Sequence, residues 1–117
     1  MKISLLLVDD HAVVRVGLRM LLESEPDIEI VGEADSASEA LNQVARSLPD
    51  VVLMDIGLPD LSGIDATREI KRLSPETAVI ALTIHEDEEY FFKMLEAGAS
   101  GYVPKRAAPE ELLTAIR

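Results

Sequence analysis

The sequence predicts an α/β fold in which a five-stranded parallel sheet is covered by helices on both faces. Short aliphatic runs alternate along the chain with longer stretches of helical periodicity. The most apolar runs lack polar alternation, which is typical of parallel strands that are buried on both sides. The chain has 117 residues, 48% of them hydrophobic, which is enough for a core of its own. We therefore expect residues 1–117 to form a single domain.

Five segments are expected to form the strands. Ile3–Val8 and residues 51–54 and 79–83 are almost continuously apolar and should lie in the centre of the sheet. Ile28–Ala34 alternates more between apolar and polar positions, which suits an edge strand. Gly101–Pro104 is the shortest candidate, and its final proline, which lacks an N–H group, is tolerated at a strand end or at a sheet edge.

The segments between the strands carry helix signals. Ser36 followed by Glu39 has the spacing of a capping box, and Ser62 stands where an N-cap would begin another helix. In the first two helices, the residues expected to pack on the sheet are Val14, Leu18, Leu21 and Leu22, and then Ala40, Leu41, Val44 and Ala45.

The last two helices are expected near the C-terminus. The acidic residues 87–89 suit the first turn of a helix that ends at Gly98 or Gly101. Pro109 suits the first position of a final helix, which would have only two or three turns before the sequence stops at Arg117. We therefore expect that this helix is cut short and that a further C-terminal segment is missing.

The composition argues against several functions for this domain. Its 11 basic and 22 acidic residues give a formal net charge of -11, which is unsuited to binding nucleic acid or an anionic membrane. There is no cysteine, so no disulfide or thiolate metal site exists. The apolar run Ile3–Val8 is too short for a signal peptide or a membrane span. We expect a cytoplasmic protein that does not contact membranes.

Polar residues gather at the carboxyl ends of the predicted strands. Asp9 and Asp10 follow the first strand and Asp55 follows the third. Thr83 ends the fourth strand, and Lys105 follows the fifth. Sites in open parallel sheets form beyond these ends, where the strand order reverses. Each residue alone could be a helix cap, a strand residue or a surface lysine, but their conjunction predicts a site.

The chemistry of these residues indicates a metal-dependent phosphoryl acceptor. Carboxylates held close together repel one another and favour a bound cation. Oxygen ligands at an exposed edge favour Mg²⁺ or Mn²⁺ over zinc, for which neither histidine has partners at a suitable spacing. A carboxylate can attack phosphorus to form an aspartyl phosphate. The metal and Lys105 would neutralise the transferring group, while Thr83 donates a hydrogen bond to it.

Four blocks that together span nearly the whole chain resemble response-regulator receiver domains. They are Leu-Val-Asp-Asp-His at 7–11, Leu-Met-Asp-Ile-Gly-Leu-Pro-Asp-Leu-Ser-Gly at 53–63, Ala-Leu-Thr at 81–83 and Gly-Tyr-Val-Pro-Lys at 101–105. Asp-Asp-His, Val-Arg-x-Gly-Leu at 14–18 and Gly-Ala-Ser-Gly-Tyr at 98–102 are similar to the branch that carries a C-terminal LuxR-type helix-turn-helix domain.

The resemblance implies a flavodoxin-like fold with strand order 2-1-3-4-5 and phosphorylation of Asp55 by a histidine kinase in a Mg²⁺-dependent phosphorelay. Asp9 or Asp10 would ligate the metal together with Asp55. The backbone carbonyl of Gly57 would be a further ligand, and Lys105 would pair with the phosphoryl group. Such a domain takes part in its own phosphoryl transfer and is not an enzyme with a separate substrate.

The resemblance also implies a switch. Thr83 and Tyr102 match the family's switch pair: phosphorylation would draw the Thr83 hydroxyl inward and open space for Tyr102 to turn. The implied output is a homodimer that regulates transcription, with DNA contacted by the missing C-terminal domain.

Several positions depart from the family pattern. Gly57 stands where many members carry a side chain, and His85 flanks the phosphate from another loop. We hypothesise that Gly57 leaves the path of hydrolytic water open, unless His85 closes it. Arg106 replaces a common proline, so the peptide isomer after Lys105 is left open. His11 is expected at a loop or helix start and not as a phosphoryl carrier.

Three other functions compete with this interpretation. An aspartate-dependent phosphatase would need a general acid at the position of Gly57. A flavin or nucleotide module would need a phosphate-binding loop where Asp9 and Asp10 instead repel phosphate. A receiver-like interaction module that is never phosphorylated stays open as the alternative.

Overall fold

The computed structural model describes residues 2–55, 57–58, 60, 62–83, 88–104 and 109–117. Strands and helices alternate strictly along this part of the chain. The elements are β1 (Ile3–Val8), α1 (Ala12–Glu23), β2 (Ile28–Ala34), α2 (Ala37–Ser47), β3 (Val51–Asp55), α3 (Gly63–Leu73), β4 (Ala78–Thr83), α4 (Glu88–Glu96), β5 (Gly101–Pro104) and α5 (Pro109–Ile116).

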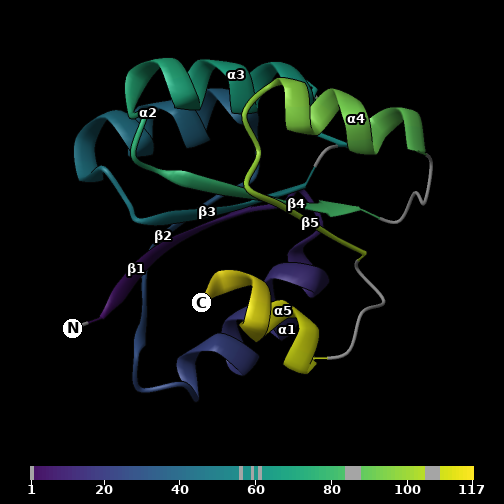
Figure 1. Cartoon of the computed structure of the whole chain (residues 1–117). Helices are drawn as coiled ribbons and strands as arrows, with labels where there is room; N and C mark the ends of the chain where they lie inside the picture. The colour runs from purple at the N-terminus through teal and green to yellow at the C-terminus, as the bar shows by residue number, and fades with distance from the viewer. Residues whose placement is uncertain (1, 56, 59, 61, 84–87, 105–108) are drawn as a thin grey trace.

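The described strands form one parallel sheet of five strands in the order β2-β1-β3-β4-β5. Helices α2, α3 and α4 cover one face, and α1 and α5 cover the other (Figure 1). The predicted fold class and strand order are confirmed. The chain runs from β1 outward to β2 and then returns to β3, so the strand order reverses between β1 and β3. The carboxyl ends of these two strands therefore flank the expected site.

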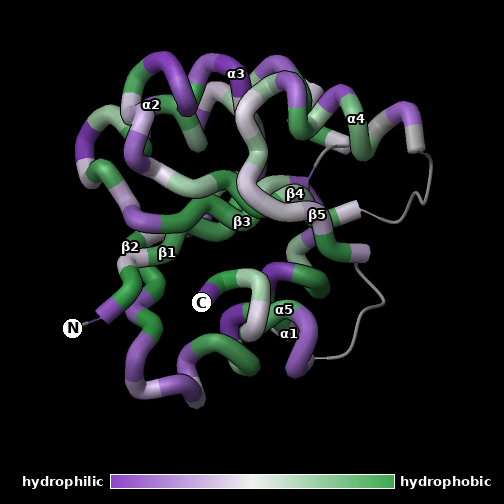
Figure 2. The backbone as a smooth tube through the Cα atoms, viewed as in Figure 1, coloured by the Kyte–Doolittle hydropathy of each residue, from purple (hydrophilic) through white to green (hydrophobic). Residues whose placement is uncertain are grey.

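The central strands are buried because both of their faces meet helices. In β1, Leu6 and Val8 pack toward α2 and α3, whereas Leu5 and Leu7 pack toward α1 and α5. This is the two-residue alternation of a strand, with both sides apolar. Figure 2 shows the same pattern, since the central strands are hydrophobic and the hydrophilic residues lie mainly along the helices and turns.

The helix starts confirm Ser36 and Ser62 as N-cap residues. The hydroxyl of Ser36 accepts a hydrogen bond from the N–H of Glu39 at 3.2 Å, and Ser62 caps α3 through the N–H of Asp65 at the same distance. Gly98 follows α4 with a φ of 106°, which glycine adopts without the steric cost of a Cβ atom.

One packing prediction is wrong. Ala45 is exposed, although Ala40 and Val44 of the same helix are buried. Ala45 lies at the rim of the apolar stripe, about 80° to 90° from its centre at 100° per residue. Helical period predicts the direction of a buried face but not its width. Within the described ranges, no helix combines the length and the apolar character needed to cross a bilayer.

Candidate functional site

Four of the predicted site residues lie at the carboxyl ends of neighbouring strands. Asp9 and Asp10 directly follow β1, Asp55 is the last residue of β3, and Thr83 is the last residue of β4. Asp9, Asp55 and Thr83 are only 1%, 4% and 1% exposed, whereas Asp10 is exposed. Two buried carboxylates at the end of a hydrophobic sheet are unusual, because burial disfavours their charged form.

The acidic residues come together as the sequence predicts. Asp9, Asp10, His11 and Asp55 each offer one ligand atom, and these atoms all lie within 4.8 Å of one another. Three carboxylates at this separation repel one another unless a cation compensates them. Hard oxygen ligands at an edge open to solvent suit Mg²⁺ or Mn²⁺, which keep several water ligands. The residues present therefore fit a divalent cation.

His11 belongs to the same cluster. It is the N-cap residue of α1, as expected for a helix-start residue, but its side chain makes no capping hydrogen bond. Its Nδ1 atom lies 3.1 Å from Oδ1 of Asp9, 3.1 Å from Oδ1 of Asp10 and 3.8 Å from Oδ2 of Asp55. His11 therefore lies beside three carboxylates, two of them from its preceding neighbours in the chain, while the prediction that the site does not suit zinc stays a prediction.

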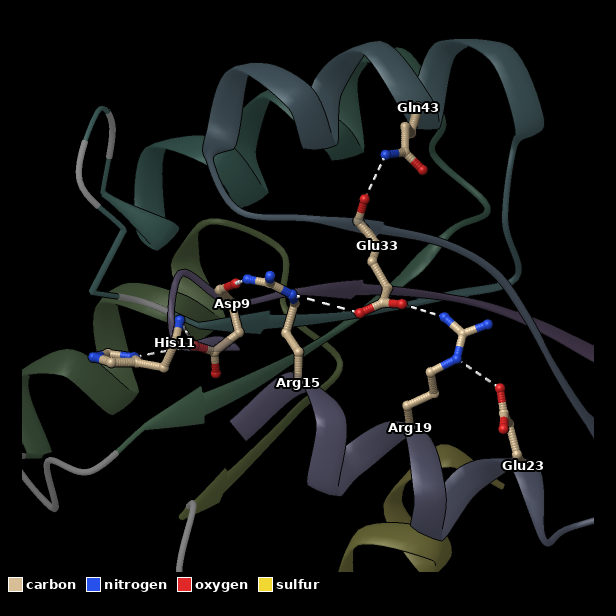
Figure 3. Close-up of polar contacts among 7 residues, drawn as sticks. All are labelled: Asp9, His11, Arg15, Arg19, Glu23, Glu33 and Gln43. Carbon is tan, nitrogen blue, oxygen red and sulfur yellow. Dashed lines mark hydrogen bonds and ion pairs between the residues drawn. The ribbon is translucent and has the colours of Figure 1, made fainter. Parts of the chain in front are cut away.

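The turn that carries Asp9 and Asp10 is held from two sides. The N–H of Asp9 donates to the carbonyl of Ala34 at 3.0 Å, and Nη1 of Arg15 donates to the carbonyl of Asp9 at 2.5 Å. Nε of Arg15 in turn lies 3.5 Å from Oε1 of Glu33 on β2. Figure 3 shows this chain of contacts running from the acidic turn across α1 and β2.

Sequence reasoning missed Arg15 as part of the site. Its neighbour Arg19 donates hydrogen bonds to both Glu33 and Glu23, so Glu33 is shared between two arginines of α1 (Figure 3). From β2, the carbonyl of Glu33 also accepts a hydrogen bond from Nε2 of Gln43 at 2.7 Å. The bond from Arg15 goes to a backbone carbonyl, so the sequence carries no signal that marks it.

Gly57 approaches the central carboxylate through its backbone. Its N–H donates to Oδ1 of Asp55 at 3.0 Å. A Cβ atom built on Gly57 would meet only that same oxygen within 4 Å among the described residues, at 3.6 Å. Among the described residues, the space beside the Asp55 carboxylate is therefore open at this position.

The two residues of the predicted switch lie on adjacent strands. Thr83 pairs with Pro104, and Tyr102 pairs with Ala81 two residues earlier. The Tyr102 ring is half-buried and meets the Phe91 ring of α4 edge to face, with centroids 5.4 Å apart. Any rotation of Tyr102 would thus change its contact with α4.

Three residues named from the sequence lie outside the described residues: Lys105, Arg106 and His85. The pairing of Lys105 with a phosphoryl group stays a prediction, as do the part assigned to His85 and the peptide isomer after Lys105.

Comparison with known proteins identifies the family. Residues 5–117 match the family model described as "Response regulator receiver domain". The chain is 44% identical over 115 residues to the response regulator UvrY of Escherichia coli, and 41% identical over 115 residues to the response regulator GacA of Pseudomonas viridiflava. These matches cover 98% of this chain but 53% and 54% of the relatives, so the chain spans about half of their length.

A solved structure agrees with these matches. The crystal structure of a LuxR-family two-component response regulator from an Aurantimonas species superimposes with a TM-score of 0.94 at 41% identity, covering 99% of this chain and 83% of that one. The sequence matches and the structural superposition identify the same family. The chain therefore belongs to the response regulator receiver domain family, the phosphorelay signalling domains of two-component systems.

Proposed function

We propose that Asp55 accepts a phosphoryl group from a histidine kinase. The observation that carries this proposal is the 4% exposed Asp55 carboxylate at the end of the central strand β3, within 4.8 Å of ligand atoms from Asp9 and Asp10. One Asp55 oxygen forms a bond to phosphorus while the P–N bond to the kinase histidine breaks. The departing imidazole takes up a proton from solvent, so charge and atoms balance.

Asp9, Asp10 and Asp55, with the carbonyl oxygen of Gly57, would hold Mg²⁺, and Mn²⁺ would substitute for it. When bound, the cation neutralises charge on the transferring phosphoryl group. The N–H of Gly57 donates to Oδ1 of Asp55 and so orients the carboxylate. Burial of Asp9 and Asp55 strengthens their interaction with a cation. Lys105 would pair with the phosphoryl oxygens.

We propose further that Thr83 and Tyr102 transmit the conformational effect of phosphorylation to the surface of the domain. The buried Thr83 hydroxyl would move toward the new phosphoryl oxygens, and the Tyr102 ring would turn into the space left behind. Because that ring contacts Phe91, α4 would shift with it. Phosphorylation would bias an existing equilibrium, limited by the contacts that the phosphoryl group makes differently in the two states.

In the whole protein, the shifted surface would favour a homodimer that regulates transcription through a DNA-binding domain outside this chain. Two observations support this assignment. The matched relatives are about twice as long as the chain, and the Aurantimonas relative is a LuxR-family response regulator. The charge of -11 is unsuited to DNA binding by this domain itself.

The proposal is tested by locating the modification. The protein is incubated with acetyl phosphate and Mg²⁺, reduced with borohydride, digested and mapped by mass spectrometry. We expect Asp55 to be converted to homoserine through its acyl phosphate. Asp50, at the opposite end of β3, is the internal control because its carboxylate is held by Ser4 away from the site. Conversion of another aspartate would contradict Asp55 as the acceptor, and conversion of none would favour the interaction module that is never phosphorylated.

A further inference from the structure

We propose that the His11 imidazole is a direct ligand of the divalent cation, so that the site prefers later transition metals over Mg²⁺ more strongly than an all-oxygen site would. The inference rests on the metal site of the proposed function. It adds a ligand and a metal preference to that site.

The positions of the ligand atoms support this assignment. In octahedral coordination with metal–ligand bonds of about 2.1 Å, neighbouring ligand atoms lie about 3.0 Å apart and opposite ones about 4.2 Å apart. Nδ1 of His11 lies 3.1 Å from carboxylate oxygens of both Asp9 and Asp10, which matches two neighbouring positions. Its distance of 3.8 Å from Oδ2 of Asp55 falls between the two ideal values. Small shifts would complete the geometry.

The local backbone brings the ring to this place. The N–H of His11 donates to Oδ1 of Asp9 at 2.8 Å, which closes a tight turn directly after the acidic pair. The side chain makes no capping hydrogen bond to α1, although it stands at the N-cap position. Its side chain is 62% exposed, so solvent was available to it, yet Nδ1 lies among three carboxylates.

Nitrogen ligation changes the expected metal preference. Mg²⁺ favours oxygen ligands and dehydrates reluctantly, whereas imidazole is a good ligand for nickel, copper and zinc. A site with three carboxylates and one imidazole should therefore bind Ni²⁺ much more tightly than Mg²⁺. Replacing the imidazole should weaken Ni²⁺ binding while leaving Mg²⁺ binding almost unchanged.

A second arrangement of the same atoms predicts the opposite result. If the ring only donates a hydrogen bond to the carboxylates, a cation must displace it. Removing the ring would then strengthen the binding of every cation. The two arrangements are therefore distinguished by the sign of the change in affinity.

The test compares the untagged wild type, His11→Asn and His85→Asn, which replaces the only other histidine of the chain. Ni²⁺ and Mg²⁺ affinities are measured by calorimetry at about pH 8, above the ordinary pKa of imidazole. We expect His11→Asn to lower Ni²⁺ affinity by about tenfold or more, as loss of a ligand does, with little change for Mg²⁺. Circular dichroism confirms that each variant is folded.

A spectroscopic measurement detects the metal–nitrogen contact itself. In pulsed electron paramagnetic resonance of the Mn²⁺-loaded protein, we expect ¹⁴N coupling in the wild type and in His85→Asn but none in His11→Asn. Absence of the coupling in the wild type, its loss in His85→Asn, or tighter binding of both metals by His11→Asn would overturn the inference. Phosphorylation is not needed for either measurement, so failure of Asp55 to be phosphorylated would contradict the proposed function alone.

Discussion

Nη1 of Arg15 donates a hydrogen bond of 2.5 Å to the carbonyl oxygen of Asp9 and so ties α1 to the turn that carries the acidic pair. The side chain of Arg15 is 21% exposed and lies beside Glu33, which fixes the guanidinium from β2. Because the interaction is with the backbone of Asp9, it sets the direction of the carboxylates without occupying them.

The first prediction concerns this tie. We expect Arg15→Met to lower the free energy of unfolding by about 1.5 to 3 kcal/mol, the usual range for a hydrogen bond from a charged group, and to weaken Mg²⁺ binding. Urea denaturation and Mg²⁺ titration measure the two effects. Arg19→Met is the matched control, because Arg19 also pairs with Glu33 but is bonded to Glu23 and not to Asp9. Wild-type Mg²⁺ affinity in Arg15→Met would contradict this account.

The strands and their ends were predictable from the sequence because they depend on local patterns. Continuous aliphatic runs predict buried parallel strands, and the bounds of Ile3–Val8 match the structure, as do those of the alternating edge strand Ile28–Ala34. Strands that run in parallel place their carboxyl ends together, so the convergence of Asp9 and Asp55 followed from the fold class.

The contacts that the sequence did not reveal depend on side-chain directions. Whether the His11 ring turns to solvent or to the acidic residues is decided by groups from two strand ends, including the distant Asp55. The bond from Arg15 goes to a carbonyl oxygen, which every residue carries, so no residue type marks it. Ala45 shows the same limit for packing, since its exposure depends on how α2 is placed over the sheet.

The second prediction concerns the lifetime of the phosphoryl group. We expect Gly57→Asn to slow dephosphorylation, because an amide side chain there would cover the open space beside Oδ1 of Asp55. The Cβ contact of 3.6 Å is an ordinary one, so the described residues leave room for a Cβ atom at this position. Gly57→Ala is the control, since it stiffens the backbone equally but covers little. The decay of the acyl phosphate is followed by intact mass; equal rates for wild type and Gly57→Asn would refute the prediction.

The third prediction separates phosphorylation from its output. We expect Thr83→Ala to accept the phosphoryl group but to lose phosphorylation-dependent dimerisation. The variant lacks the hydroxyl that would move toward the phosphoryl oxygens and so make room for Tyr102. Thr77→Ala is the matched control. It removes the same atoms from the residue directly before β4, far from the site, where the hydroxyl donates to the carbonyl of Pro49 at 2.7 Å. Analytical ultracentrifugation of the phosphorylated proteins measures dimerisation. A Thr83→Ala variant that dimerises like Thr77→Ala would show that the hydroxyl carries no signal.

The fourth prediction concerns the dependence of stability on pH. Hydrogen bonds from Arg117 at 2.8 Å, to both oxygens of Asp27, hold the pKa of that carboxyl below its ordinary value. A carboxyl whose pKa is lower in the folded state stabilises the fold above its unfolded pKa of about 3.9. That stabilisation is lost as the pH falls through the lower, folded pKa.

We therefore expect the stability difference between the wild type and Arg117→Gln to be larger at neutral pH than in strong acid. Carbon NMR of the Asp27 carboxyl should show a higher pKa in the variant than in the wild type. High salt should reduce the difference, because the pair is exposed to solvent. Identical Asp27 titrations in the two proteins would show that the pair does not form in solution.

The central claim is that Asp55 is the phosphoryl acceptor of a metal-dependent site, and intact mass spectrometry tests it most directly. Wild type, Asp55→Asn and Asp50→Asn are incubated with acetyl phosphate, with Mg²⁺ or with a chelator. We predict a gain of one phosphoryl group for the wild type and Asp50→Asn with Mg²⁺ only, and none for Asp55→Asn. Equal phosphorylation of Asp55→Asn, or no gain by the folded wild type in Mg²⁺, would contradict the claim.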